Sequence, residues 1–296
     1  MCGRLFARIL KNRIGFLRAL LVLGRVSNLP TVWSNCLAAW WLAGAGNVDK
    51  LPFLLVGATS LYTGGMFLND AFDVEFDRQY RKERPIPSRA IGLKAVWVWG
   101  VAWLGLGLCC LAWTGATAGV LGLALAGCIV LYDAVHKRVS FAPALMGLCR
   151  FVLYLTAAST AVNGMNQKVI GCAVALFAYI VGLSYVARRE SVVGPLRYWP
   201  ILLVAMPVLV ALIFNHGYQT ENALLLSAVF VVWTVKSLRY TLWTDEPNIG
   251  RTVSGLLAGI VLVDLLAVAN APREFGVVFV GLFLLALLFQ RFVPAT

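Results

Sequence analysis

The chain of 296 residues is far more apolar than a soluble protein: 60% of its residues are hydrophobic, 13% are charged and its mean hydropathy is +0.82. This composition excludes a soluble globular domain and predicts an all-α, polytopic membrane protein. The formal net charge of +12 fits basic segments that lie on the inner side of a membrane, next to anionic lipid. We therefore expect no nucleic-acid partner.

The first predicted element is an amphipathic surface helix over residues 1–26, on the inner face of the membrane. Its apolar face is formed by Phe6, Leu10, Ile14, Leu17 and Leu21. An organelle transit peptide is the alternative, because the segment is rich in arginine and has no acid. Residues 27–296 are predicted to form a single transmembrane domain.

Apolar windows of about 20 residues predict a helical bundle of nine core transmembrane helices and a tenth. The expected spans are residues 27–46, 51–71, 93–113, 116–135, 143–162, 168–187, 198–215, 221–241, 252–270 and 275–292. With the N-terminus inside, all of the 25 Lys and Arg residues except Lys50, Lys168 and Arg273 fall on the inner side. We therefore expect a multi-pass protein of a bacterial inner membrane, with its N-terminus and its active site in the cytoplasm.

Carboxylates cluster at the inner end of the second expected span. On a helix Asp70, Asp73 and Asp77 project within about 60° of each other, with Asn69 beside them. Three like charges repel unless a cation lies among them, and oxygen ligands suit Mg²⁺ holding a phosphorylated substrate. The alternative is a solvated helix end whose acids pair with the arginines that follow. The position between an apolar span and a basic loop favours the Mg²⁺ site.

A second polar cluster ends the fourth expected span. Asp133 and Lys137 lie one helical turn apart, a spacing at which they can simply pair. In the functional alternative, Lys137 and Arg138 neutralise phosphate oxygens while Tyr132 adds a hydrogen bond. The residues alone do not separate these two interpretations.

Polar side chains also occur inside the apolar spans. Asn28 and Asn35 share a face with Thr31, which fits either a substrate contact or hydrogen bonds between helices. Arg150 lies about two turns into its span, where it either reaches back to the surface or faces an internal polar cavity. Asp264 lies past the middle of its span and needs a partner or a proton, but the sequence names no partner.

The sequence Asn69-Asp70-x-x-Asp73-x-x-x-Asp77, followed by Arg84-Pro85-Ile86-Pro87-Ser88, resembles the UbiA superfamily of intramembrane prenyltransferases. Residues 132–137 are similar to the Tyr/Lys element that the family carries after its fourth span. The resemblance covers roughly residues 28–243. It implies an all-helical fold around a lateral cavity.

The resemblance also implies roles for these residues. Three acids would be the Mg²⁺ ligands: Asp70, Asp73 and Asp77. The catalytic set would be Asn69, Asp70, Asp73, Asp77 and Lys137. Substrate contacts are expected from Asn28, Asn35, Arg84, Tyr132, Asp133, Arg138, Arg150, Tyr185, Arg188, Arg189 and Glu190.

The chain departs from the family at the second acidic motif, DxxxD at the inner end of the sixth span. Here the sequence is Ala187-Arg188-Arg189-Glu190-Ser191, in which a single acid remains. Arg188 and Arg189 could replace a second metal ion by charge-assisted hydrogen bonds, so we expect fewer metal ions. This pattern is similar to that of the UbiA-like proteins encoded in Ebo gene clusters.

The expected activity is the Mg²⁺-dependent transfer of an isoprenoid group from a prenyl diphosphate to a small acceptor that the sequence does not identify. Two alternatives on the same fold are the transfer of a sugar phosphate onto a polyprenyl phosphate and the cyclisation of a terpene. A third is a lipid-binding or transport protein without catalysis.

Overall fold

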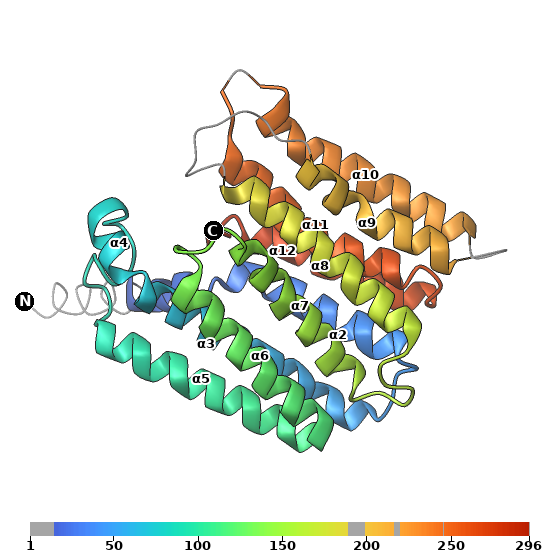
Figure 1. Ribbon diagram of the computed structural model, residues 1–296, viewed down its shortest axis with the longest axis horizontal. Coiled ribbons are helices and arrows are strands. Elements are labelled where there is room, and N and C mark those ends of the chain that lie inside the picture. Colours follow the sequence, from blue (N-terminus) through green and yellow to red (C-terminus); the bar gives the residue numbers. More distant parts are fainter. Residues whose placement is uncertain (1–14, 189–198, 216–219, 245, 296) are drawn as a thin grey trace, which may run out of the picture.

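The computed structural model describes residues 15–188, 199–215, 220–244 and 246–295, and every regular element in these ranges is helical. The long helices lie side by side in one bundle (Figure 1). After a helical stretch at residues 15–23 the elements are η1 (Val26–Asn28), α2 (Leu29–Leu42), η2 (Val48–Lys50), α3 (Leu51–Phe72), α4 (Val74–Tyr80), α5 (Leu93–Thr114), α6 (Ala116–Val135), α7 (Ala142–Ala158), α8 (Gln167–Ala187), α9 (Trp199–Phe214), α10 (Thr220–Leu242), α11 (Ile249–Ala267) and α12 (Arg273–Phe289).

Each of the ten expected spans coincides with one of the long helices. Among the described residues, six helical segments are long and apolar enough to cross a membrane: 48–72, 93–114, 116–135, 167–187, 220–242 and 249–267. The helices α7 and α9 are apolar but shorter. The predicted all-helical membrane fold is therefore confirmed, while the expected number of crossings stays a prediction.

Small residues let α3 and α5 approach each other closely. A Cβ atom added to Gly64 would lie 2.9 Å from the carbonyl oxygen of Gly100, and one added to Gly107 would lie 2.9 Å from that of Gly57. Backbones this close gain van der Waals contact that larger side chains would prevent. The packing fixes the position of α3, whose C-terminal end carries the acidic cluster.

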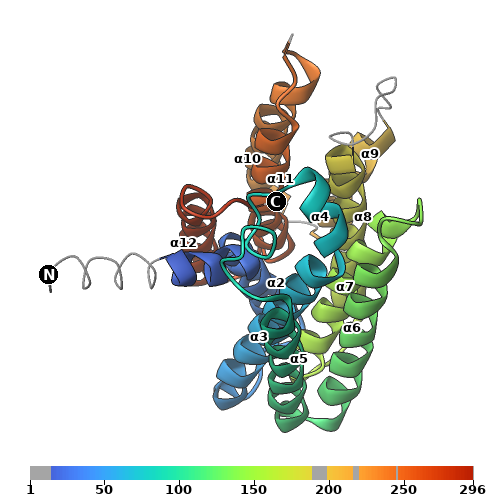
Figure 2. The same cartoon turned by 90° about the vertical axis from the view of Figure 1, so that its left-hand side faces the viewer.

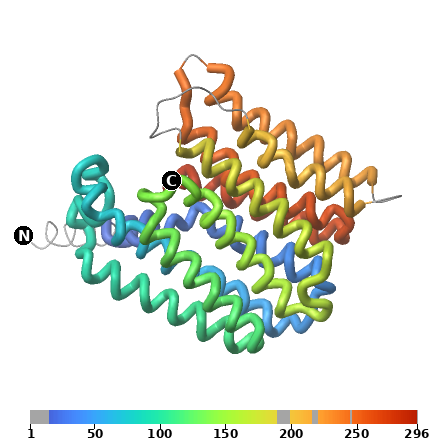
Figure 3. The backbone as a smooth tube through the Cα atoms, in the orientation of Figure 1, coloured from blue at the N-terminus to red at the C-terminus, as the bar shows by residue number. Residues whose placement is uncertain are grey.

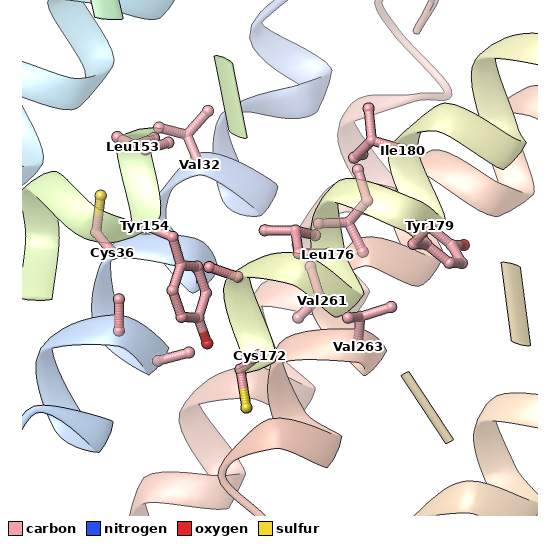
Figure 4. Close-up of a cluster of buried hydrophobic side chains, with 14 of the residues drawn as sticks. Val32, Cys36, Leu153, Tyr154, Cys172, Leu176, Tyr179, Ile180, Val261 and Val263 are labelled. Atoms are coloured by element: carbon pink, nitrogen blue, oxygen red, sulfur yellow. The ribbon is translucent and has the colours of Figure 1, made fainter. Parts of the chain in front are cut away.

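The apolar core lies between α2, α7, α8 and α11. In Figure 4 Val32 of α2 lies next to Leu153 of α7, the ring of Tyr154 points toward Cys172 of α8, and Leu176 lies next to Val261 of α11. Large apolar side chains on the outer surface are exposed, as a surface facing lipid requires; Trp113 and Leu202 are 75% and 72% exposed. The core holds the helices together, while the acidic cluster lies at one end of the bundle.

The N-terminal helix and the C-terminal tail meet at the same end of the bundle. The tube in Figure 3 returns from α12 toward residues 15–23 and α4. There the Asn28 amide donates to the carbonyl oxygen of Ala295 at 2.9 Å, and the Ser27 hydroxyl to that of Pro294. Leu17 and Leu21 are exposed, and residues 1–14 lie outside the described part, so the amphipathic surface helix stays a prediction.

Candidate functional site

The acidic stretch spans a break between two helices. α3 ends at Phe72, α4 begins at Val74, and Asp73 lies between them. The amide of Asp73 still donates to the carbonyl of Asn69, and the amide of Asp77 to that of Asp73, at 3.0 and 2.9 Å. The helical register therefore continues through the break. This keeps the predicted acids on adjacent turns at one end of the bundle.

Two arginines hold Asp70, which is only 2% exposed. The Arg84 guanidinium donates to its carboxylate at 3.1 Å, and that of Arg25 lies 3.5 Å away. Arg25 also donates to the amide oxygen of Asn69 at 3.1 Å, and the Asn69 amide donates to Asp133 at 3.0 Å. Four segments of the chain therefore meet around one carboxylate.

Asp73 is bound by the residues that follow α6. The Lys137 ammonium lies 2.7 Å from its carboxylate and His136 lies 3.5 Å away. Burial tends to raise the pKa of Asp73, but the hydrogen bonds and charges of His136 and Lys137 outweigh it and lower the pKa. Burial on its own would lower the pKa of His136, but the hydrogen bond and charge of Asp73 outweigh it, so the pKa of His136 is raised. The ring of Tyr132 stacks on that of His136, with centroids 5.0 Å apart.

Asp77 differs from the other two acids. It is 3% exposed, and among the described residues it forms no ion pair. Burial raises its pKa; Arg84 opposes this, whereas the charges of Asp70 and Asp73 add to it. Its carboxylate is the least neutralised of the three.

The donor chemistry of these acids fits Mg²⁺, which prefers carboxylate oxygens. No cluster of three His, Cys, Asp or Glu side chains in the described ranges is tight enough to hold a metal ion. Basic side chains instead neutralise Asp70 and Asp73 directly. A phosphate group would attract the same basic side chains and release the carboxylates for a metal ion.

Arg188, at the position of the missing second acidic motif, turns toward the backbone after α6. Its guanidinium donates to the carbonyl oxygens of His136, Val139 and Ser140 at 3.1, 2.7 and 2.6 Å. The Tyr185 hydroxyl donates to the same Ser140 carbonyl at 3.4 Å. Arg188 thus fixes the segment that presents Lys137 to Asp73, and its expected contact with phosphate stays a prediction.

The other predicted substrate residues fall into different environments. Arg138 is exposed on the segment after α6. Arg189 and Glu190 lie outside the described residues. Asn28 is buried against the C-terminal tail.

Asn35 and Arg150 belong to a polar network inside the bundle. Arg150 donates to the Asn35 amide oxygen at 2.7 Å and to Thr31. Asp264 accepts hydrogen bonds from Ser34 at 2.5 Å and from Asn35 at 2.7 Å. Asn35 thus bridges the cation and the acid, and Asp264 has the partners that the sequence did not name. These contacts agree with the expectation of hydrogen bonds between helices.

Sequence reasoning missed two members of the acidic site. Arg25 is one of the basic residues near the N-terminus and has no individual pattern, and His136 is a single histidine inside the element at residues 132–137. The signal for His136 is its place one residue before Lys137. Arg25 has no such signal, because its contact with Asp70 depends on how the surface helix docks.

The geometry defines a class: an all-helical membrane protein with a site of carboxylates and cations at one end of the bundle, suited to a phosphorylated ligand. Residues 28–248 match the UbiA prenyltransferase family. The chain belongs to this family. The resemblance in the sequence is thereby confirmed.

The named relatives are similar to parts of the chain. The digeranylgeranylglyceryl phosphate synthase of Ignicoccus hospitalis is 38% identical over 93 residues, covering 31% of this chain and 30% of that protein. The protoheme IX farnesyltransferase of Alkalihalophilus pseudofirmus is 33% identical over 127 residues, covering 41% of each chain. The matched segments thus span less than half the length of these relatives.

A solved structure shares the fold over nearly its full length. The UbiA homologue from Archaeoglobus fulgidus, bound to DMAPP and Mg²⁺, aligns with a TM-score of 0.52 at 12% identity. The alignment covers 93% of this chain and 99% of that one. The arrangement of the helices is therefore that of a UbiA homologue.

Proposed function

We propose that the protein transfers an isoprenoid group from a prenyl diphosphate to a small acceptor, in a Mg²⁺-dependent reaction inside the membrane. One observation carries this proposal: Asp70 and Asp73 are each held by cations that come from other segments of the chain. Family membership and relatives named as prenyl-transferring enzymes support it.

In this mechanism Asp70, Asp73 and Asp77 would hold Mg²⁺, which supplies positive charge to the departing diphosphate when bound. Arg84 and Lys137 bind the phosphate oxygens by charge-assisted hydrogen bonds. They neutralise the charge that develops as the allylic carbon–oxygen bond breaks. The apolar helices keep water from the carbocation until the acceptor attacks it.

We also propose that the site faces the cytoplasm of a bacterial cell, with the protein in the inner membrane. The support is the excess of Lys and Arg on the side that carries the acids. Cysteines introduced at the exposed positions Arg78 and Met165, in a variant without native cysteines, test the orientation. An impermeant maleimide applied to intact cells should label only Met165→Cys; labelling of Arg78→Cys alone would reverse the orientation.

The activity is tested with purified protein, labelled geranylgeranyl diphosphate and shorter prenyl diphosphates, with and without Mg²⁺. The wild-type protein should release diphosphate only with Mg²⁺, and Asp73→Ala should not. Glu75→Gln is the matched control, because Glu75 lies two residues away but is exposed and, within the described ranges, pairs with Arg78 alone. Full activity of Asp73→Ala would exclude the proposal, and mass spectrometry of the product separates prenyl transfer from cyclisation or phosphate-sugar transfer.

A further inference from the structure

A cavity of about 620 Å³ lies beside the acidic site. Its walls come from the N-terminal helix, the loop after α4 and the C-terminal tail. Figure 2 shows that loop passing close to the end of the N-terminal helix. None of the three site aspartates lines it.

The lining of the cavity is strongly basic. It contains Arg18, Arg25, Arg81 and Arg84, against the single carboxylate of Glu83. Among the described residues, Arg18 and Arg81 form no ion pair. Arg18 is exposed and Arg81 is half-buried, so both guanidinium groups are free to bind an anion in the cavity.

The other two arginines connect the cavity to the acidic site. Arg25 and Arg84 line the cavity and also contact Asp70, at 3.5 and 3.1 Å. The Nε atom of Arg25 is buried and has no hydrogen-bond partner. Arg25 also adopts a left-handed backbone, with φ of 40°, which is unfavourable for a residue with a side chain. An anion in the cavity would therefore meet the two arginines that also hold Asp70.

The size and remaining lining of the cavity limit the ligand. The volume falls within the range of small-molecule sites, about 300–1,000 Å³, and greatly exceeds that of a bare phosphate. Ala19, Val22 and Pro85 add apolar surface. Planar guanidinium groups bind phosphate oxygens in pairs. The ligand class is therefore an amphiphile with a phosphate head group.

We propose that this cavity is a second anion site, which binds the phosphate head group of an amphiphilic molecule on the far side of Arg25 and Arg84 from the aspartates. The head group belongs either to the acceptor or to a membrane phospholipid. Its assignment as the acceptor site rests on the proposed prenyl transfer, but anion binding does not.

The shared arginines predict coupling between the two sites. An anion in the cavity draws Arg25 away from Asp70 and shares the charge of Arg84, which makes that carboxylate more available to a divalent cation. By linkage, each ligand then raises the affinity for the other by the same factor. Dodecyl phosphate should therefore strengthen the binding of Mn²⁺, a Mg²⁺ substitute detected by electron paramagnetic resonance, without any prenyl diphosphate.

The test measures the binding of dodecyl phosphate to purified full-length protein by titration calorimetry, with dodecanol as the uncharged probe. The variant Arg18→Gln/Arg81→Gln should bind dodecyl phosphate at least about 10-fold more weakly than the wild type, and Arg18→Lys/Arg81→Lys should restore part of the loss. Arg78→Gln, which removes an exposed arginine outside the cavity, should bind like the wild type.

Competition by lipid nanodiscs then shows whether the head group belongs to the acceptor or to a membrane phospholipid. If phosphatidylglycerol nanodiscs abolish dodecyl phosphate binding and phosphatidylcholine nanodiscs do not, the head group is that of an anionic lipid; if neither competes, it is that of a phosphomonoester acceptor. Equal binding by the wild type and Arg18→Gln/Arg81→Gln overturns the proposal. Because no prenyl diphosphate is used, this result stands apart from a failure of the proposed transfer.

Discussion

Asp70 and Asp264 are both almost completely buried, yet they are satisfied in different ways. Asp70 is held by Arg25 and Arg84, which come from the end of the surface helix and from a loop. Asp264 accepts hydrogen bonds from the neutral side chains of Ser34 and Asn35 on a packed helix. The first site holds charges that a ligand can recruit. The second is bound by neighbouring neutral side chains through one carboxylate oxygen, Oδ2, while the buried Oδ1 has no hydrogen-bond partner, and this position inside the packed bundle indicates a structural role.

The largest predicted effect separates these two acids directly. Asp70→Asn should lower the rate of diphosphate release about 100-fold to 1,000-fold, the usual loss for one preorganised electrostatic group. Asp264→Asn should change the rate little, because the new amide oxygen still accepts from Ser34 and Asn35. Steady-state rates of both variants check this. A loss in Asp264→Asn as large as that in Asp70→Asn would contradict the comparison.

A second prediction concerns the stability of the internal network. Arg150→Met removes the hydrogen bonds from Arg150 to Thr31 and Asn35. Each hydrogen bond between membrane helices contributes about 0.6 kcal/mol, so the free energy of unfolding should fall by about 2 kcal/mol. Denaturant unfolding in lipid nanodiscs measures this, with the KM for prenyl diphosphate as the second readout. An unchanged stability with a raised KM would instead place Arg150 in the substrate site.

Much of the fold could be read from the sequence because the bilayer imposes a simple rule. The apolar windows predicted the helices α2, α3 and α5–α12. The spacing of Asp70, Asp73 and Asp77 indicated that they share one helix end. The pairing of Asp70 with Arg84 agrees with the alternative in which the acids pair with the arginines that follow. The contacts of Arg25 with Asp70 and of Asp73 with His136 and Lys137 could not be read, because these groups are far apart in sequence. The break at Asp73 has no proline or glycine to announce it.

A smaller effect should follow from loosening the segment after α6. Arg188→Gln removes the guanidinium that donates to three backbone carbonyls of this segment, so Lys137 is held less firmly. We expect the KM for prenyl diphosphate to rise about 10-fold, equivalent to 1.4 kcal/mol, with a smaller change in kcat.

Arg188→Lys is the conservative comparison and should recover part of the affinity, whereas Arg78→Gln should behave like the wild type. If kcat alone falls while KM stays constant, Arg188 does not act through the position of Lys137.

The smallest predicted effect is a pH dependence of stability from the pair of His136 and Asp73. The pKa of His136 is raised by Asp73, so its protonated form is favoured in the folded protein. This contribution is fully present below the unfolded pKa of about 6.5 and is lost as the pH rises through the folded pKa. It should amount to less than about 1 kcal/mol.

Between pH 6 and pH 9 the free energy of unfolding should therefore depend less steeply on pH in His136→Asn than in the wild type. The same slope in the variant and in the wild type would show that the pair contributes no charge-dependent stability.

The most direct measurement is the binding of Mn²⁺ in the presence of an unreactive geranylgeranyl thiodiphosphate, followed by electron paramagnetic resonance. The account predicts that the analogue creates a Mn²⁺ site in the wild type and in Glu75→Gln, and that this site is lost in Asp70→Asn and Asp73→Asn. Equal Mn²⁺ binding in all four proteins would contradict it.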